Sequence, residues 1–215
     1  MLKLMYLARR RPGFTVDEFV RRWRRHGALG MQQPLWRFAL GYVQSEPIRP
    51  APLAGASQQY DAVASYMVSD DMFSSMTAED IEGATAMAAD ELETFAAPIG
   101  SVSLWVREEH IQAGDRGSVG AYLFFRPGAA AQECATRLAG RPGLQRLVLN
   151  HRDDDANAPD MNALPYAAIL EASAPGLAAL AAAVGDAPAG LLQAADVAVV
   201  TREAVLWDRL PQDCV

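Results

Sequence analysis

The strongest constraint on the fold is an order of six segments that occurs twice along the chain. The first half reads as strand, helix, strand, strand, helix and strand, and the second half repeats this order with weaker similarity. The opening strands of the two halves, in "LKLMYLARRRPG" and "VGAYLFFRPGA", both end in Arg-Pro-Gly. A repeat on this scale indicates two copies of one structural unit. We predict a first module at 1–111, a linker at 112–118 and a second, diverged module at 119–215.

The strand-like segments are apolar on both sides. Leu2, Leu4 and Tyr6 alternate with Met5 and Leu7 in the first of them. A β-α-β-β-α-β unit has both helices on one face of its sheet, and an antiparallel sheet covered only on that face has a polar opposite face. The other half of the chain must therefore cover the second face. The predicted fold class is α+β: two ferredoxin-like βαββαβ modules whose antiparallel four-stranded sheets pack face to face into a pseudo-dimeric α/β barrel, with four helices outside.

Charge and apolar patterning exclude several classes of protein. A net charge of −7 argues against a nucleic-acid partner, which requires a basic surface. The first apolar run is too short for a secretory signal, and no window has the 18 apolar residues of a membrane span. Cys134 and Cys214 have no disulfide or metal spacing, so we expect reduced thiols in a cytoplasmic protein.

The first helix is strongly signalled in "TVDEFVRRWRRHGALG". Thr15 and Glu18 have capping-box spacing, and Phe19 and Trp23 belong to the apolar stripe that would face the sheet. The arginines fall mostly outside this stripe. The second helix, expected from about Thr77 to Ala97, is rich in Asp and Glu, so we predict ion pairs between the two helices.

The opening segment carries a family resemblance. "MLKLMYLARRRPGFTVDEFVRRWRRHGALG" resembles the start of EthD-like proteins of the dimeric α+β barrel superfamily, in which a strand and a Pro-Gly turn precede a helix with Glu18, Phe19, Trp23, His26 and Gly27 at the motif positions. A strand motif of that family is similar to "GYVQSE" in the first half and to "LVLNH" in the second.

This resemblance implies a module that pairs sheet to sheet, usually between two chains, so a tandem chain would supply both modules itself. Further association into a homodimer of tandem chains stays open. Relatives include cofactor-free monooxygenases, decarboxylases, haem-handling enzymes and proteins of no known activity, so the resemblance does not decide the function.

Two histidines are candidates for catalysis. His26 lies at the end of the first helix, where it could be structural, bonded to helix carbonyls, or a general acid/base that reaches a cavity between the sheets. His151 ends a strand of the second half and could likewise be structural or functional. The acidic loop that begins at His151 has consecutive aspartates that cannot all reach one ion, so we predict no metal site.

Aromatic residues on the strands and the first helix would form the core and line part of such a cavity. The candidate substrate-binding residues are Tyr6, Trp23, Tyr42, Tyr66, Trp105 and Tyr122. An apolar pocket with a few hydroxyls and a histidine suits a hydrophobic or aromatic small molecule. The sequence has no nucleotide-binding or zinc-binding motif, and we expect no cofactor.

Two functions follow from these residues. The first is a cofactor-independent oxidoreductase or lyase with His26 as acid/base and Tyr6, Tyr66 or His151 orienting the substrate. The alternative is a non-catalytic ligand-binding or accessory module. A cavity lined by His26 favours the enzyme, and a His26 bonded to helix carbonyls in a packed interior favours the module.

Overall fold

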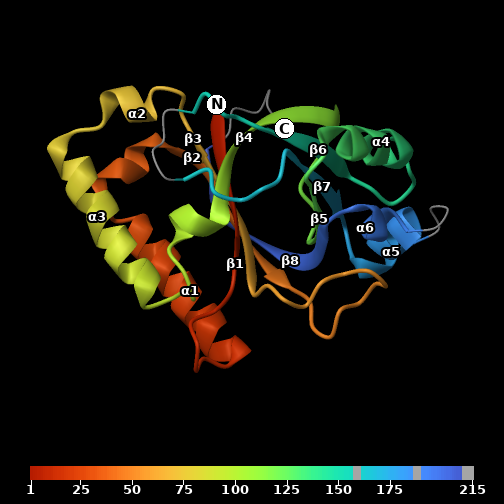
Figure 1. Cartoon of the computed structure of the whole chain (residues 1–215), viewed down its shortest axis with the longest axis horizontal. Coiled ribbons are helices and arrows are strands. Elements are labelled where there is room, and N and C mark those ends of the chain that lie inside the picture. Colours follow the sequence, from red (N-terminus) through yellow and green to blue (C-terminus); the bar gives the residue numbers. More distant parts are fainter. Residues whose placement is uncertain (157–160, 186–189, 210–215) are drawn as a thin grey trace.

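Eight antiparallel strands form one closed barrel in the computed structural model, which describes residues 1–156, 161–185 and 190–209 (Figure 1). The strands are β1 (Leu2–Ala8), β2 (Ala39–Pro47), β3 (Ala62–Val68), β4 (Ser103–Gln112), β5 (Val119–Phe125), β6 (Arg146–Arg152), β7 (Ala168–Ala174) and β8 (Val197–Asp208). The helices are α1 (Val16–Gly30), α2 (Met72–Ser75), α3 (Ala78–Leu92), α4 (Gly128–Leu138), α5 (Leu177–Gly185) and α6 (Leu191–Ala194), with 3₁₀ turns η1 (Pro34–Phe38) and η2 (Ile99–Val102).

The strand order shows how the two halves share the barrel. Around the barrel the order is β1-β3-β2-β8-β5-β7-β6-β4. Each half therefore contributes four neighbouring strands, and the pairs β2–β8 and β4–β6 join the halves. The predicted face-to-face sheets are thus continuous with each other at both edges. The mixed α/β class and the barrel are confirmed, while the division into ferredoxin-like modules at 1–111 and 119–215 stays a prediction.

The helices cover the outside of the barrel on two opposite sides. In Figure 1, α1, α2 and α3 lie beside the first-half strands, and α4, α5 and α6 lie beside the second-half strands. Alternation along each strand decides which residues face which layer. In β1, Leu4 and Tyr6 face α1 and α3, whereas Met5 and Leu7 face the barrel interior. The prediction that both faces of the strands are covered is therefore correct.

Helix α1 forms as the sequence indicates. Thr15 accepts a hydrogen bond from the backbone N–H of Glu18, and the Glu18 carboxylate accepts from the Thr15 backbone N–H at 2.8 Å. Phe19 and Trp23 are completely buried and stacked, with ring centroids 5.6 Å apart. Val16 is 38% exposed because it lies in the first turn of α1, at the edge of the layer.

Helix α3 ends at Leu92 rather than at Ala97. Beyond it, the chain turns so that Phe95 is buried and packs edge-on against Tyr6 and Phe19. Phe95 also forms an isolated bridge with Arg10. Tertiary packing of one aromatic side chain therefore overrides the helix propensity of the alanines that follow it.

The predicted linker packs against the second half of the barrel. Its first residue, Gln112, still belongs to β4. A Cβ atom on Gly117 would lie 2.0 Å from the carbonyl oxygen of Ala174, and one on Gly114 would lie 2.2 Å from that of Gln145. Only glycine permits this close approach, so the segment is fixed against β6 and β7.

Candidate functional site

A cavity of about 600 Å³ lies between the outer face of the first-half strands and the helices α1 and α3. From the strands, Leu4, Tyr6, Tyr42, Tyr66 and Trp105 line it. A volume of this size falls in the range of small-molecule sites. The cavity therefore lies outside the barrel, under the helices, and not between the sheets as we predicted from the sequence.

The space between the sheets is filled by side chains. The residues packed there are Met5, Leu7, Val63, Leu104, Val106, Tyr122, Phe124, Tyr166, Ile169 and Val199. In contrast, the helices over the cavity present small residues, including Gly30, Ala84 and Ala88. Small side chains on the helices, opposite large ones on the strands, leave the layer incompletely filled.

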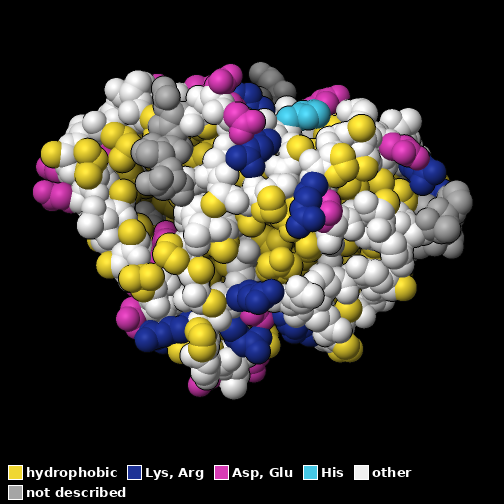
Figure 2. Space-filling view, viewed as in Figure 1, with side chains coloured by type: hydrophobic (Ala, Val, Ile, Leu, Met, Phe, Trp, Pro, Cys, Tyr) yellow, Lys and Arg dark blue, Asp and Glu magenta, His cyan; other side chains and the backbone are white. Residues whose placement is uncertain are grey.

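Methionines make up much of the remaining wall. Met72, Met76, Met87 and Met161 all line the cavity. Thioether side chains are flexible and adapt to aromatic surfaces. The same side of the molecule carries hydrophobic groups at the surface, as Figure 2 shows over α3. The cavity wall is thus apolar and adaptable, which suits a hydrophobic molecule.

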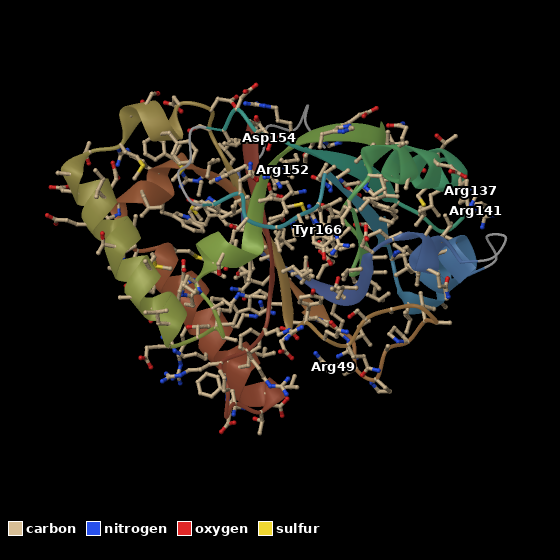
Figure 3. The ribbon with its side chains drawn as sticks, viewed as in Figure 1. Arg49, Arg137, Arg141, Arg152, Asp154 and Tyr166 are labelled. Atoms are coloured by element: carbon tan, nitrogen blue, oxygen red, sulfur yellow. The ribbon has the colours of Figure 1, made fainter. Side chains whose placement is uncertain are left out.

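Met161 comes from the second half of the chain. It belongs to the segment between β6 and β7, which Arg152 holds through bonds to the carbonyl oxygens of Asn162 at 2.8 Å and Leu164 at 2.7 Å. Arg152 also bonds Asp154 at 2.6 Å, and the two side chains lie next to each other in Figure 3. Both halves of the chain therefore contribute to the cavity.

His26 is part of the cavity wall and is 6% exposed. Its Nδ1 atom lies 2.7 Å from Oδ2 of Asp90 on α3, and its ring packs edge-on against Phe95. Asp90 also binds Arg22, so one carboxylate serves two partners on α1. Burial lowers the pKa of His26, and the bond to Asp90 offsets only part of this effect. The neutral imidazole is favoured, with Nε2 as the nitrogen that remains for a bound molecule.

Glu91 is a second ionisable residue of the wall. Its Oε2 atom accepts a hydrogen bond from the backbone N–H of Ile99 at 2.8 Å. Burial raises the pKa of Glu91, and the neighbouring charge of Asp90 raises it further. A carboxylate in this environment is a stronger proton acceptor than one in water.

The tyrosines of the strands form a hydrogen-bonded group with α1. Trp23 Nε1 donates to the Tyr6 hydroxyl at 2.7 Å, and Gln44 Nε2 donates to the Tyr42 hydroxyl at 2.7 Å. The two hydroxyls lie 3.5 Å apart. Burial raises the pKa of both Tyr6 and Tyr42, so both are neutral hydroxyls.

Four of the six predicted substrate-binding residues line the cavity. Trp23 does not: it is completely buried one layer away, where it supports Tyr6. Tyr122 faces the barrel interior, where its hydroxyl lies 2.9 Å from both Ser45 and Glu203. The side chain of Tyr122 points to the inner face of the sheet, whereas the cavity lies on the outer face under the helices. Tyr122 therefore cannot reach the cavity.

His151 is separate from this cavity. It lies at the end of β6, half exposed, with Nε2 2.6 Å from a carboxylate oxygen of Glu109, and it is not among the residues that line the wall. The structure therefore does not bring His26 and His151 into one site.

The arginines of α1 are partly as predicted. Arg22 pairs with Asp90 on α3, but Arg24 binds Gln44 and Glu46 on β2. Arg24 therefore pairs with a carboxylate of strand β2 rather than with one of the acidic helix.

The barrel interior contains an unexpected ionic network at one end. Lys3 Nζ lies 2.7 Å from Glu108 and 2.7 Å from Glu171, and Arg116 and Arg146 also bind Glu171 at 2.7 Å. Burial alone would raise the pKa of Glu171, but these three cations hold it well below its usual value. The network joins residues of β1, β4, β6 and β7 with one residue of the linker.

Two further expectations concern thiols and metals. Cys134 is a free, buried thiol in α4, and burial raises its pKa, which favours the unreactive form. Cys214 and positions 157–160 of the acidic loop that begins at His151 lie outside the described residues. Within the described ranges, no group of three or more His, Cys, Asp or Glu side chains is placed to hold a metal ion. No helix in those ranges is long and apolar enough to cross a bilayer.

Comparisons with known proteins identify the fold. No family profile and no curated protein matches the sequence. The chlorite dismutase-like protein TA0507 aligns with a TM-score of 0.53 and 10% identity over 94% of this chain and 94% of its own. An anthrone oxidase-like protein aligns with a TM-score of 0.53 and 11% identity over 98% of this chain and 95% of its own.

At such low identity the likeness shows the fold alone. The chain has the fold of the dimeric α+β barrel proteins, with the whole barrel in one polypeptide. Membership of the EthD-like family, and the origin of the chain as a tandem of two modules, stay predictions.

Proposed function

We propose that the protein is a cofactor-independent oxidoreductase or lyase that acts on a hydrophobic, aromatic small molecule in the cavity under α1 and α3. The observation that carries this proposal is the His26–Asp90 pair in the wall of an otherwise apolar cavity of about 600 Å³. A buried imidazole whose Nδ1 is held by a carboxylate has Nε2 available as a general base.

The pair does not fit the structural alternative that the sequence left open. His26 bonds a carboxylate of another helix, and the layer around it is hollow rather than packed. The name of the anthrone oxidase-like neighbour agrees with an oxidation, but at 11% identity it does not identify a reaction. In the oxidoreductase version, His26 removes a proton from a carbon atom of the substrate, and dioxygen oxidises the resulting carbanion, so that one oxygen atom enters the product and the other leaves as water.

A haem is a poor match for the residues present. Haem carries two propionate carboxylates, which basic side chains usually balance. The described residues that line the cavity include no Lys or Arg, and Glu91 adds a negative charge. No haem-dependent step is therefore part of the proposal.

Catalysis is tested by comparing two matched variants, His26→Gln and His151→Gln. Each histidine bonds one carboxylate through one ring nitrogen, but only His26 lines the cavity. Aromatic compounds that raise the melting temperature are incubated with enzyme in air, and dioxygen uptake and product formation are followed. We expect His26→Gln to lower turnover by about 10²- to 10⁴-fold and His151→Gln to leave it unchanged.

Equal turnover in wild type and His26→Gln would show that His26 is not the base. Binding without turnover of any compound would favour the ligand-binding module. A cytoplasmic location, the lack of a nucleic-acid partner and a homodimer of such chains remain predictions.

A further inference from the structure

The floor of the cavity is a row of residues at equivalent positions on four neighbouring strands. Trp105 pairs with Leu4, Leu4 pairs with Tyr66, and Tyr66 pairs with Tyr42. Because neighbouring strands lie about 4.8 Å apart, the strand positions of Trp105 and Tyr66 are separated by roughly 10 Å across Leu4. The shorter Leu4 side chain therefore lies between two aromatic side chains, and all three residues line the cavity.

Polar atoms of three lining residues have no partner. Within the described part of the chain, Trp36 Nε1, Tyr66 Oη and Trp105 Nε1 are buried and make no hydrogen bond. The indole N–H groups are donors only, and the Tyr66 hydroxyl has a proton to donate. Trp36 stacks on Tyr66 with ring centroids 5.3 Å apart, so two of the donors belong to one stacked pair. Buried polar groups are normally satisfied, so three unsatisfied donors around one cavity point to an absent acceptor.

The Tyr6–Tyr42 pair leaves one more donor. The Tyr6 hydroxyl already accepts a hydrogen bond from Trp23, and the Tyr42 hydroxyl accepts one from Gln44. Only one of the two hydroxyl protons can lie between the two oxygens. The proton of the other hydroxyl has no acceptor among the described residues. The residues on the strand side of the cavity therefore carry several hydrogen-bond donors without an acceptor.

The helix side has the opposite character. With Nδ1 of His26 held by Asp90, the neutral ring presents Nε2 as an acceptor. Glu91 uses one of its oxygens on Ile99 and has the other available. A molecule that lies between strands and helices thus meets donors on one side and proton acceptors on the other.

We propose that the cavity binds a weakly acidic aromatic ketone, whose carbonyl oxygen is held by donors of the strand side, for which Tyr66, Trp105 and Trp36 are the candidates, and whose acidic proton faces His26 and Glu91. In such a molecule the acidic proton belongs to a hydroxyl group that is conjugated with the carbonyl through the aromatic ring. Loss of this proton moves negative charge onto the carbonyl oxygen, so hydrogen-bond donors at the carbonyl stabilise the anion. Glu91 is assigned as the second proton acceptor of the site. This inference rests on the binding role proposed for the cavity.

Four compounds of the same shape test the two polar groups separately. Diphenylmethane has neither group, benzophenone has the carbonyl, 4-benzylphenol has the hydroxyl, and 4-hydroxybenzophenone has both. Dissociation constants are measured with the full chain by quenching of tryptophan fluorescence and by calorimetry. One hydrogen bond to a neutral donor corresponds to about 3- to 10-fold in affinity, so we expect 4-hydroxybenzophenone to bind at least 10-fold more tightly than diphenylmethane.

Variants assign the two ends. Trp105→Phe and Tyr66→Phe should reduce the affinity gained from the carbonyl while leaving diphenylmethane binding nearly unchanged. Trp207→Phe is the matched control, because its indole N–H already donates to the carbonyl oxygen of Ala39 at 3.2 Å. Comparing compounds within one variant cancels effects of altered shape.

The absorption spectrum of bound 4-hydroxybenzophenone reports proton transfer. Its phenolate absorbs at longer wavelength than the phenol, so near neutral pH we expect the band to shift in wild type. His26→Gln and Glu91→Gln should each reduce the shift, and His151→Gln should not.

The outcomes separate this inference from the proposed function. Equal affinity for all four compounds leaves the cavity a binding site but overturns the donor and acceptor assignment. An unshifted spectrum in wild type overturns the role of the helix side. If none of the four compounds binds, the proposed binding role fails together with the inference.

Discussion

Nδ1 of His26 and Oδ2 of Asp90 lie 2.7 Å apart and connect α1 to α3 beside the cavity. The bond fixes the ring tautomer and leaves Nε2 as the proton acceptor. It also places a carboxylate charge next to an imidazole whose pKa burial lowers. Each of these effects can be measured without knowing the substrate.

Replacing Asp90 by Asn should lower the pKa of His26 further. The Asn side chain keeps an oxygen that accepts from Nδ1, but the charge that favours the imidazolium is lost, while Arg22 remains nearby and opposes it. Titration of the His26 ring protons by NMR measures the change. An upward shift at His26 would mean that Asp90 does not stabilise the protonated ring.

Stability should fall as the pH drops below about 6.5, the usual pKa of histidine. Because the pKa of His26 is lowered in the folded state, the unfolded chain binds more protons between the folded pKa and that value. The stability contributed by the neutral ring is therefore present at neutral pH and lost as the pH falls. Urea unfolding of wild type and His26→Gln at a series of pH values measures this. The variant should show a weaker dependence on pH in this window, and an identical dependence would exclude His26 as its source.

Lys3→Met should destabilise the barrel by about 3–5 kcal/mol, because it leaves buried carboxylates without one of their cations. Lys3 is 1% exposed and lies 2.7 Å from both Glu108 and Glu171. Arg11→Met is the control, since Arg11 and Glu93 form an exposed pair whose loss should cost about 0.2–1 kcal/mol. Chemical denaturation gives both values. Equal losses would show that the interior network adds nothing beyond a surface pair.

Gly27→Ala should destabilise the protein by about 1–3 kcal/mol through overpacking. A Cβ atom at this position would lie 3.0 Å from both Gln44 Nε2 and Tyr42 Cε1, where α1 crosses β2. Gly128→Ala is a matched control at the start of α4, because a Cβ atom there has no neighbour within 4 Å. Gly27→Ala should also weaken the hydrogen bond between Gln44 and Tyr42. If Gly27→Ala and Gly128→Ala have the same melting temperature, the close packing at Gly27 is contradicted.

Much of the fold follows from local patterns in the sequence. Alternation in β1 showed that both strand faces are covered, and the Thr15–Glu18 spacing identified the start of α1. The position of the cavity could not be predicted from the sequence. An aromatic strand face with Tyr6 and Tyr66 can pack against either a partner sheet or helices. The small residues Gly30 and Ala88 on the helices were the available signal for a hollow layer.

The partner of His26 was also hidden. The second helix has several acidic residues, and only the three-dimensional crossing of α1 and α3 selects Asp90. The interior network has a clearer sequence signal. Lys3 and Glu171 are charged residues at inward positions of otherwise apolar strands, and such residues are rarely buried without partners.

The two junctions between the halves, β2–β8 and β4–β6, lie within a single polypeptide. Closing the barrel is therefore a unimolecular step. When a barrel is shared between two chains, its stability depends on their concentration, because dilution favours separate subunits. Here dilution does not affect the closure, so this barrel and the cavity wall built on its strands persist at any protein concentration.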